Sequence, residues 1–119
     1  AHWPFVERGL LEILKHGECW WTPADVRRWI REGRCWLFVS EHGFLTVEHL
    51  RDPRGEPYLN VWHMYFEPGK GWPHKAELIA FLDKLKADSK SEWIEFSGRP
   101  EWRRMVRGYF RETATVFRR

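Results

Sequence analysis

The stretch from Tyr58 to Leu85 constrains the fold most, because a strand pattern, a glycine turn and a helix pattern follow one another directly. Residues 58–66 are rich in β-branched and aromatic side chains, which is typical of a largely buried strand. Residues 67–71 (EPGKG) end the strand, because proline cannot donate to a ladder and glycine permits positive φ. After Pro73, apolar residues recur at the spacing of a core-facing helix: Leu78, Phe81, Leu82 and Leu85.

The junction between this strand and this helix is a candidate anion site. Free amide groups and the helix dipole converge where a glycine turn leads into a helix N-terminus, so a phosphate or pyrophosphate can bind there. The alternative is an ordinary connection that needs glycine only for its sharp turn. The local sequence leaves both interpretations open.

The composition indicates a single globular domain spanning residues 1–119, with 43% hydrophobic and 31% charged residues. Nine tryptophans and eight phenylalanines exceed what a core of this size needs, so some rings are expected at the surface. We expect surface positions for Trp20, Trp21 and Trp72, and core positions for Trp62, Trp93 and Trp102.

Membrane, metal and disulfide functions find no support in the sequence. No apolar run approaches the roughly 20 residues of a membrane span, and the first residues lack the apolar segment of a signal peptide. Cys19 and Cys35 have neither the spacing of a zinc site nor that of a disulfide framework. We therefore expect no metal and a reducing, cytoplasmic location.

The net charge of +3 is mild, but arginine gathers at the C-terminal end. The last 21 residues hold two glutamates and seven arginines, at 99, 103, 104, 107, 111, 118 and 119. Such a segment attracts polyanions in a general way, whereas the common alternative is the solvated face of a helix. Nucleic-acid binding is thus a minor alternative.

The N-terminal half predicts two helices followed by three strands. Residues 2–16 have a helical apolar stripe, and Thr22 and Pro23 begin a second helix that ends at Gly33. The strands are expected at 35–39, 44–48 and 58–66, and their spacing favours an antiparallel meander.

The C-terminal half predicts a fourth strand at 92–96, a helix from Ser97 to Gly108 and a closing strand at 113–117. Because a helix separates the fourth strand from the third, these two strands are expected to be parallel. The expected fold class is α+β: a mixed, mostly antiparallel sheet of about five or six strands, flanked by about four helices. The element order is α-α-β-β-β-α-β-α-β.

This order resembles the GNAT superfamily of acyl-coenzyme A-dependent N-acetyltransferases over nearly the whole chain. Residues 67–71 (EPGKG) stand where the family carries its pyrophosphate loop, and residues 106–111 (VRGYFR) resemble its Leu-Gly-Phe junction. The closest resemblance is to small GNAT-like proteins encoded by tailed bacteriophages. It implies a GNAT-like sheet, and a location in the host cytoplasm or the virion.

The resemblance also implies a cofactor, acetyl-coenzyme A, and an amine acceptor. The strand ending at Tyr65 and Phe66 would bind the pantetheine arm through backbone groups, because the next strand diverges from it. The pyrophosphate would lie on the amides of the glycine turn, with a lysine as point charge. These loop residues are Gly69, Lys70, Gly71 and Lys75.

For the proton of the attacking amine, the resemblance implies a base. His63 and Glu48 are the candidate catalytic residues, because they lie on neighbouring strands and histidine titrates near working pH. Two positions depart from the family pattern. Phe66 or Pro68 stands where the loop usually has Arg or Gln, and Arg104 stands at a common tyrosine position. These departures keep a second hypothesis open, a catalytically inactive GNAT-fold protein that interacts with other virion proteins.

Overall fold

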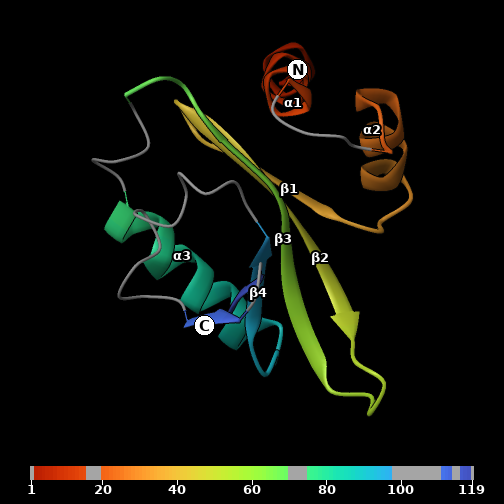
Figure 1. Cartoon of the computed structure of the whole chain (residues 1–119), viewed down its shortest axis with the longest axis vertical. Coiled ribbons are helices and arrows are strands. Elements are labelled where there is room, and N and C mark those ends of the chain that lie inside the picture. Colours follow the sequence, from red (N-terminus) through yellow and green to blue (C-terminus); the bar gives the residue numbers. More distant parts are fainter. Residues whose placement is uncertain (1, 16–19, 70–74, 98–110, 114–115, 119) are drawn as a thin grey trace.

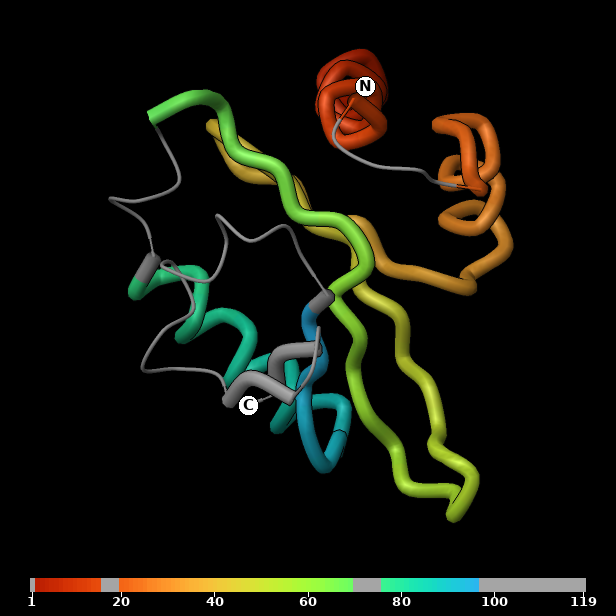
Figure 2. The backbone as a smooth tube through the Cα atoms, viewed as in Figure 1, coloured from red at the N-terminus to blue at the C-terminus, as the bar shows by residue number. Residues whose placement is uncertain are grey.

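The computed structural model describes residues 2–15, 20–69, 75–97, 111–113 and 116–118. It is a six-stranded sheet with α1 and α2 on one face and α3 on the other (Figures 1 and 2). The helices are α1 (Trp3–Leu14), α2 (Pro23–Arg31) and α3 (Lys75–Asp88). The strands are β1 (Trp36–Val39), β2 (Gly43–Arg51), β3 (Pro57–Phe66), β4 (Ile94–Ser97), β5 (Arg111–Thr113) and β6 (Val116–Arg118).

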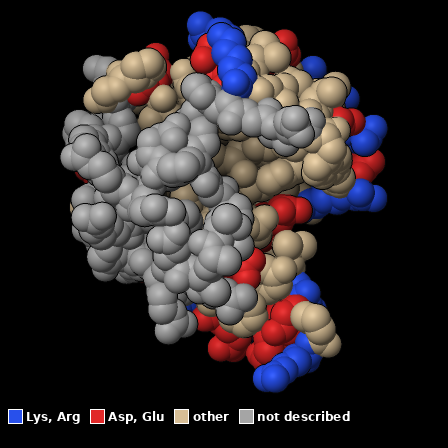
Figure 3. Space-filling view, in the orientation of Figure 1, with Lys and Arg blue, Asp and Glu red and all other residues tan. Residues whose placement is uncertain are grey.

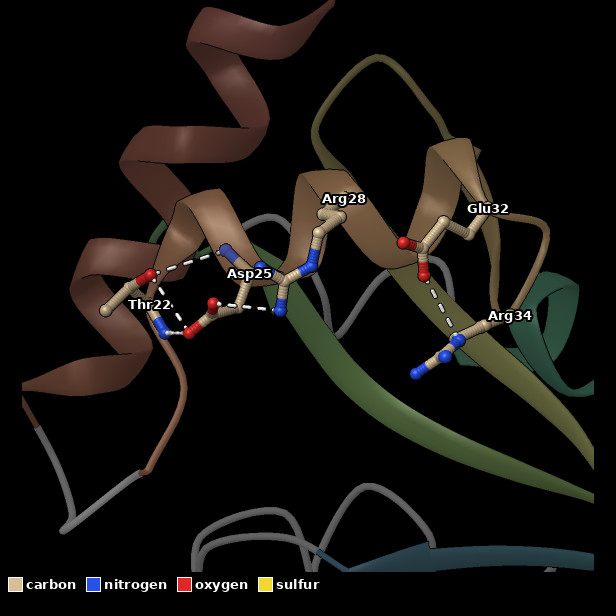
Figure 4. Close-up of polar contacts among 5 residues, drawn as sticks. All are labelled: Thr22, Asp25, Arg28, Glu32 and Arg34. Atoms are coloured by element: carbon tan, nitrogen blue, oxygen red, sulfur yellow. Dashed lines mark hydrogen bonds and ion pairs between the residues drawn. The ribbon is translucent and has the colours of Figure 1, made fainter.

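The start of α2 follows the sequence prediction closely. Thr22 is the N-cap: its side chain accepts from the backbone N–H of Asp25, and the Asp25 carboxylate accepts from the N–H of Thr22 (Figure 4). Pro23 occupies the first helical turn, where a missing N–H costs nothing. This reciprocal capping fixes where the helix begins.

The helix α1 lies against the sheet through Gly9, which is fully buried. A Cβ atom at this position would lie 2.8 Å from a ring carbon of Tyr65 and closer still to the ring of Phe44. Only glycine lets the helix come so near the two aromatic rings. The contact fixes α1 beside the ends of β2 and β3.

The predicted antiparallel meander is confirmed, with β1 paired to β2 and β2 paired to β3. The β2–β3 ladder runs from Gly43 opposite Phe66 to Arg51 opposite Pro57. One irregularity interrupts it. Thr46 lies opposite His63 and Val47 opposite Val61, so Trp62 is an extra residue in β3. Such a bulge bends its strand and increases the local twist.

The strand β4 is parallel to β3, as predicted, and the other strand pairs are antiparallel. The prediction of one closing strand at 113–117 is wrong. Two short strands, β5 and β6, pair with each other there, and β6 pairs with β4. The predicted helix ending at Gly108 lies outside the described residues, apart from Ser97, which ends β4. The predicted α+β fold class holds for the described chain.

The two faces of the sheet carry separate cores. The core on the α3 face is centred on Val47, Leu59, Val61 and Ile94, which are almost inaccessible to solvent. The opposite face packs against α1 and α2 and is richer in aromatic side chains. Trp20 is 73% exposed, as predicted, but the surface position predicted for Trp21 is wrong. Trp21 is buried because its ring packs against Trp62 and His63.

Candidate functional site

The strand β3 is longer than its partner β4, and this difference creates an open edge. Pairing between the two strands covers Leu59 to Val61 on β3 and ends with Val61 opposite Phe96. The strand β3 continues for five more residues, to Phe66. Within the described parts of the chain, no strand pairs with this side of β3 beyond Val61. The bulge at Trp62 lies where the pairing ends.

The direction of each amide in β3 follows from three hydrogen bonds. The N–H of Leu59 donates to the Trp93 carbonyl at 3.0 Å, on the β4 side. The N–H of His63 donates to the Thr46 hydroxyl at 3.0 Å, and that of Glu67 to the His42 carbonyl at 2.8 Å, both on the β2 side. Backbone groups alternate in direction along a strand.

The N–H groups of Met64 and Phe66 therefore point away from β2, toward the open edge of β3. Phe66 was among the predicted cofactor-binding residues, whereas Met64 was missed. Its side chain is typical of a core residue, and it is buried on the α3 face. Only the register after the bulge reveals that its backbone faces the opening.

The predicted phosphate turn is described only in part. Gly69 is exposed and has φ of +77°, a left-handed conformation that side chains disfavour, and no heavy atom lies within 4 Å of the place a Cβ would take. Lys75 is the first described residue of α3. Lys70 and Gly71 lie outside the described residues. The described ends of this segment are thus Gly69 after β3 and Lys75 in α3.

A groove of about 840 Å³ lies between α1 and the end of β3. The predicted cofactor residues Tyr65 and Phe66 line it together with two basic side chains, Arg8 and Lys15. Arg8 lies over the ring of Phe5, and Lys15 forms an exposed ion pair with Glu12. The groove combines aromatic walls with charges of both signs, because Glu12 and Glu67 also line it, and it lies next to the glycine turn.

His63 is buried on the α1 and α2 face, with 3% of its surface exposed. Its Nδ1 lies 2.7 Å from the Thr46 hydroxyl, and its ring lies 4.4 Å from the Trp21 ring and 4.2 Å from the Trp62 ring between centroids. Burial lowers the pKa of His63 to about 3, so the imidazole is neutral near pH 7. A neutral ring with this pKa is a poor proton acceptor, and the predicted role of His63 as base stays a prediction.

Glu48 belongs to a polar row that crosses three strands. Glu48 lies opposite Asn60, and Asn60 lies opposite Glu95 on β4. Asn60 donates through Nδ2 to Glu48 at 2.9 Å, and Trp93 donates through Nε1 to Glu95 at 3.1 Å. Residues directly opposite share a face, and the strand neighbours of this row point to the α3 core. The row therefore lies on the same face as His63.

Glu95 was missed by sequence reasoning. The alternation of Ile94, Glu95 and Phe96 predicts its face, but its two strand neighbours in space come from residues 35 and 47 positions earlier. The second carboxylate on this face is therefore visible only once the parallel pairing of β3 and β4 is known.

Cys35 precedes β1 and is buried near this row. Burial and the charge of Glu48 raise the pKa of its thiol to about 11, so the thiol stays protonated. Among the described residues, no three His, Cys, Asp or Glu side chains are grouped to hold a metal ion. No helix in the described ranges is long and apolar enough to cross a membrane.

The rest of the described surface has a second groove and a mixed distribution of charge. A smaller groove of about 460 Å³ lies between α3 and the β1–β2 turn and is lined by Phe38, Phe66 and Phe81, away from the polar row. On the face shown in Figure 3, basic and acidic side chains are interspersed over the described surface. Most of the arginine-rich end lies outside the described residues.

Comparison with known proteins identifies the fold. The structure is similar to a ribosomal-protein-alanine N-acetyltransferase from Brucella melitensis biovar Abortus 2308, with a TM-score of 0.62 and 14% identity, over 91% of this chain and 82% of that one. It is also similar to Tetrahymena GCN5, with a TM-score of 0.55 and 7% identity, over 98% of this chain and 84% of that one. No protein-family model and no curated protein matches the sequence. The likeness confirms the GNAT-like fold predicted from the sequence.

Proposed function

We propose that this protein is an acyl-coenzyme A-dependent N-acetyltransferase that transfers an acetyl group to an amine. One observation carries the proposal: among the described strands, β3 loses its β4 partner after Val61 and presents the backbone N–H of Met64 to this open edge. A pantetheine arm is an extended amide chain, so it can pair with such an edge as an added strand.

The residues around the opening fit the remaining parts of acetyl-coenzyme A. Its pyrophosphate would meet the amides of Gly69, Lys70 and Gly71 at the N-terminal end of α3, with Lys70 or Lys75 as the point charge. Arg8 in the adjacent groove would be the basic side chain available to its phosphates, because Lys15 is paired with Glu12. When bound, the cofactor supplies a thioester, an acyl group already activated for attack.

The acceptor amine would approach from the α1 and α2 face, where the carboxylates lie. Its nitrogen would form a bond to the acetyl carbon while the carbon–sulfur bond breaks, coenzyme A would leave as the thiolate, and the nitrogen would lose a proton. Glu48 is the proposed acceptor for this proton, with Glu95 across Asn60 as a second carboxylate that attracts the ammonium form. The half-buried rings of Trp29 and Trp62 would contact an apolar part of the acceptor.

The finer predictions from the resemblance remain part of this proposal. A phage origin, a cytoplasmic location and contacts with virion proteins rest on the sequence resemblance alone. The alternative, an inactive GNAT-fold protein of a phage particle, predicts that acetyl-coenzyme A does not bind.

Thermal unfolding with and without acetyl-coenzyme A tests the proposal, because a ligand that binds only the folded state raises the midpoint. We expect a rise that saturates with acetyl-coenzyme A and none with acetate plus adenosine. Amide exchange measured by NMR locates the site: the Met64 amide should exchange faster than those of His63 and Tyr65, and should slow on cofactor addition. If millimolar acetyl-coenzyme A changes neither the unfolding midpoint nor the exchange of the Met64 amide, the proposal is contradicted.

If binding is observed, coenzyme A release with a panel of amines tests transfer. Glu48→Gln should bind acetyl-coenzyme A like the wild type and lose about 10²-fold or more of the rate, as expected for removal of a general base. Glu56→Gln is a matched control, because Glu56 is exposed in the β2–β3 loop. An unchanged rate in Glu48→Gln would remove Glu48 from the mechanism.

A further inference from the structure

The tautomer of His63 depends on its hydrogen bond with Thr46. The Thr46 hydroxyl oxygen accepts a hydrogen bond from the backbone N–H of His63, and this bond uses one of its two lone pairs. Its own proton needs an acceptor, and among the described residues His63 Nδ1 lies within hydrogen-bond distance of it, at 2.7 Å. If Nδ1 accepts from Thr46, a neutral imidazole carries its proton on Nε2.

This Nε2–H group is buried and has no hydrogen-bond partner among the described residues. A buried donor without a partner costs about 1–3 kcal/mol, so a folded protein rarely keeps one without a reason. The ring is also neutral, because burial lowers its pKa to about 3. In this tautomer His63 is an uncharged donor held in place by its neighbours.

The location of His63 suggests what this donor is for. The β3–β4 pairing ends at Val61, Trp62 is the extra residue of the bulge, and His63 follows directly. The bulge places consecutive side chains, those of Trp62 and His63, together on the α1 and α2 face, where their rings touch. The donor thus belongs to the residue at which β3 begins its open edge, and the Trp21 ring packs edge-on against the same imidazole.

We propose that His63 Nε2–H donates a hydrogen bond to the thioester carbonyl oxygen of the acyl-coenzyme A, as a neutral electrophile in place of a base. This inference rests on the proposed function. The carbonyl oxygen gains negative charge as the carbon–nitrogen bond forms and loses it as the carbon–sulfur bond breaks. The imidazole keeps its proton throughout, and the proton of the amine leaves through Glu48.

Two substitutions separate donation from proton transfer. His63→Gln retains an N–H donor near the Nε2 position, and His63→Phe retains an aromatic ring but removes the donor. We expect His63→Phe to lose about 10²–10³-fold in kcat, as for an oxyanion-hole donor, with KM for acetyl-coenzyme A little changed. His63→Gln should recover most of this loss, with the wild-type pH profile. Equal losses in both variants, or a shifted pH profile, overturn the proposal.

A second measurement does not depend on activity. The ¹⁵N chemical shifts of the His63 ring in the wild-type protein report its tautomer, and we expect the neutral Nε2–H form from pH 5 to pH 8. The Nε2–H resonance should move when acetyl-coenzyme A binds. A ring that titrates near pH 6.5, or one that carries its proton on Nδ1, overturns the proposal.

The controls distinguish failure of this inference from failure of the proposed function. Circular dichroism and thermal unfolding establish that each variant folds. If the wild type acetylates amines and the folded His63→Phe variant keeps the full rate, the inference about His63 fails and the proposed function stands. If the wild type does not bind acetyl-coenzyme A, both the inference about His63 and the proposed function fail.

Discussion

The two halves of β3 differ in what borders them. The first half, Pro57–Val61, is paired to β2 on one side, and its residues from Leu59 on are paired to β4 on the other. The second half, Trp62–Phe66, is paired to β2 alone within the described chain, and it begins with a bulge. One strand thus serves as a central element of the sheet and then as an edge.

This difference separates stability from function along a single strand. In the first half, backbone groups are bonded to neighbouring strands and the side chains of Leu59 and Val61 fill the core. In the second half, the backbone N–H of Met64 faces the open edge, and the buried His63 ring has a nitrogen, Nε2, without a hydrogen-bond partner among the described residues. A buried donor without a partner is costly, so it indicates a place where a ligand completes the structure.

Proline substitutions in the two halves of β3 test this comparison, and they should have the largest effect on the free energy of unfolding. Leu59→Pro removes the N–H that donates to the Trp93 carbonyl and truncates a fully buried side chain, so it should lower the free energy of unfolding by about 4 kcal/mol or more. Phe66→Pro should cost about 2 kcal/mol, because its N–H lies on the side of β3 that no described strand pairs with there, and its side chain is half-buried. Urea denaturation measures both.

The acetyl-coenzyme A affinity of the folded Phe66→Pro variant completes this test, since the variant lacks one edge donor. We expect weaker binding. Equal destabilisation by the two prolines would mean that both halves of β3 are paired alike.

Acid should destabilise the folded protein through His63, which lies in the second half of β3. Its pKa is about 3 in the folded protein and about 6.5 in the unfolded chain, so between these values only the unfolded chain binds the proton. The contribution of His63 is complete above pH 6.5 and falls by up to about 1.4 kcal/mol per pH unit as the pH drops toward 3. Urea denaturation from pH 7 to pH 4.5 should show a steeper loss in the wild type than in His63→Gln. Parallel curves would contradict a depressed pKa.

Thr46 connects the bulge to β2, and its hydroxyl can be removed with little change in shape. Thr46→Val leaves the backbone N–H and Nδ1 of His63 without their partner, and we expect a loss of about 2 kcal/mol in the free energy of unfolding. Thr46→Ser retains the hydroxyl and should lose less than half as much. If the two variants are equally stable, the hydroxyl does not hold His63.

Two glycines at opposite ends of β3 allow the smallest and most selective test. Gly55 precedes the strand with φ of +86°, Gly69 follows it with φ of +77°, and neither has heavy atoms near a Cβ position. Alanine at either position should cost about 1 kcal/mol of unfolding free energy, from backbone strain alone. Only Gly69→Ala should also weaken acetyl-coenzyme A binding, measured by titration calorimetry. Equal affinities in the two variants would exclude the turn at Gly69 from the cofactor site.

Local patterns predicted the secondary structure well where each element is specified by its own residues. Thr22, Pro23 and Asp25 encode a helix start within four positions, and the structure contains that capping box. The apolar runs of the meander also fell close to their observed strands. The surface position of Trp21 was predicted wrongly, because burial of a ring depends on which distant rings reach it.

The sequence by itself determined α1 to α3, β1 to β4, their order and the parallel relation of β3 and β4, because helix periodicity, strand composition and turn residues act over a few neighbouring positions. Tertiary structure alone decided where the β3–β4 pairing stops, where the ladder takes an extra residue, and that Glu95 joins Glu48 across Asn60. These features depend on register between segments far apart in the chain. A one-residue change of register turns every following side chain to the other face, and no local pattern records it.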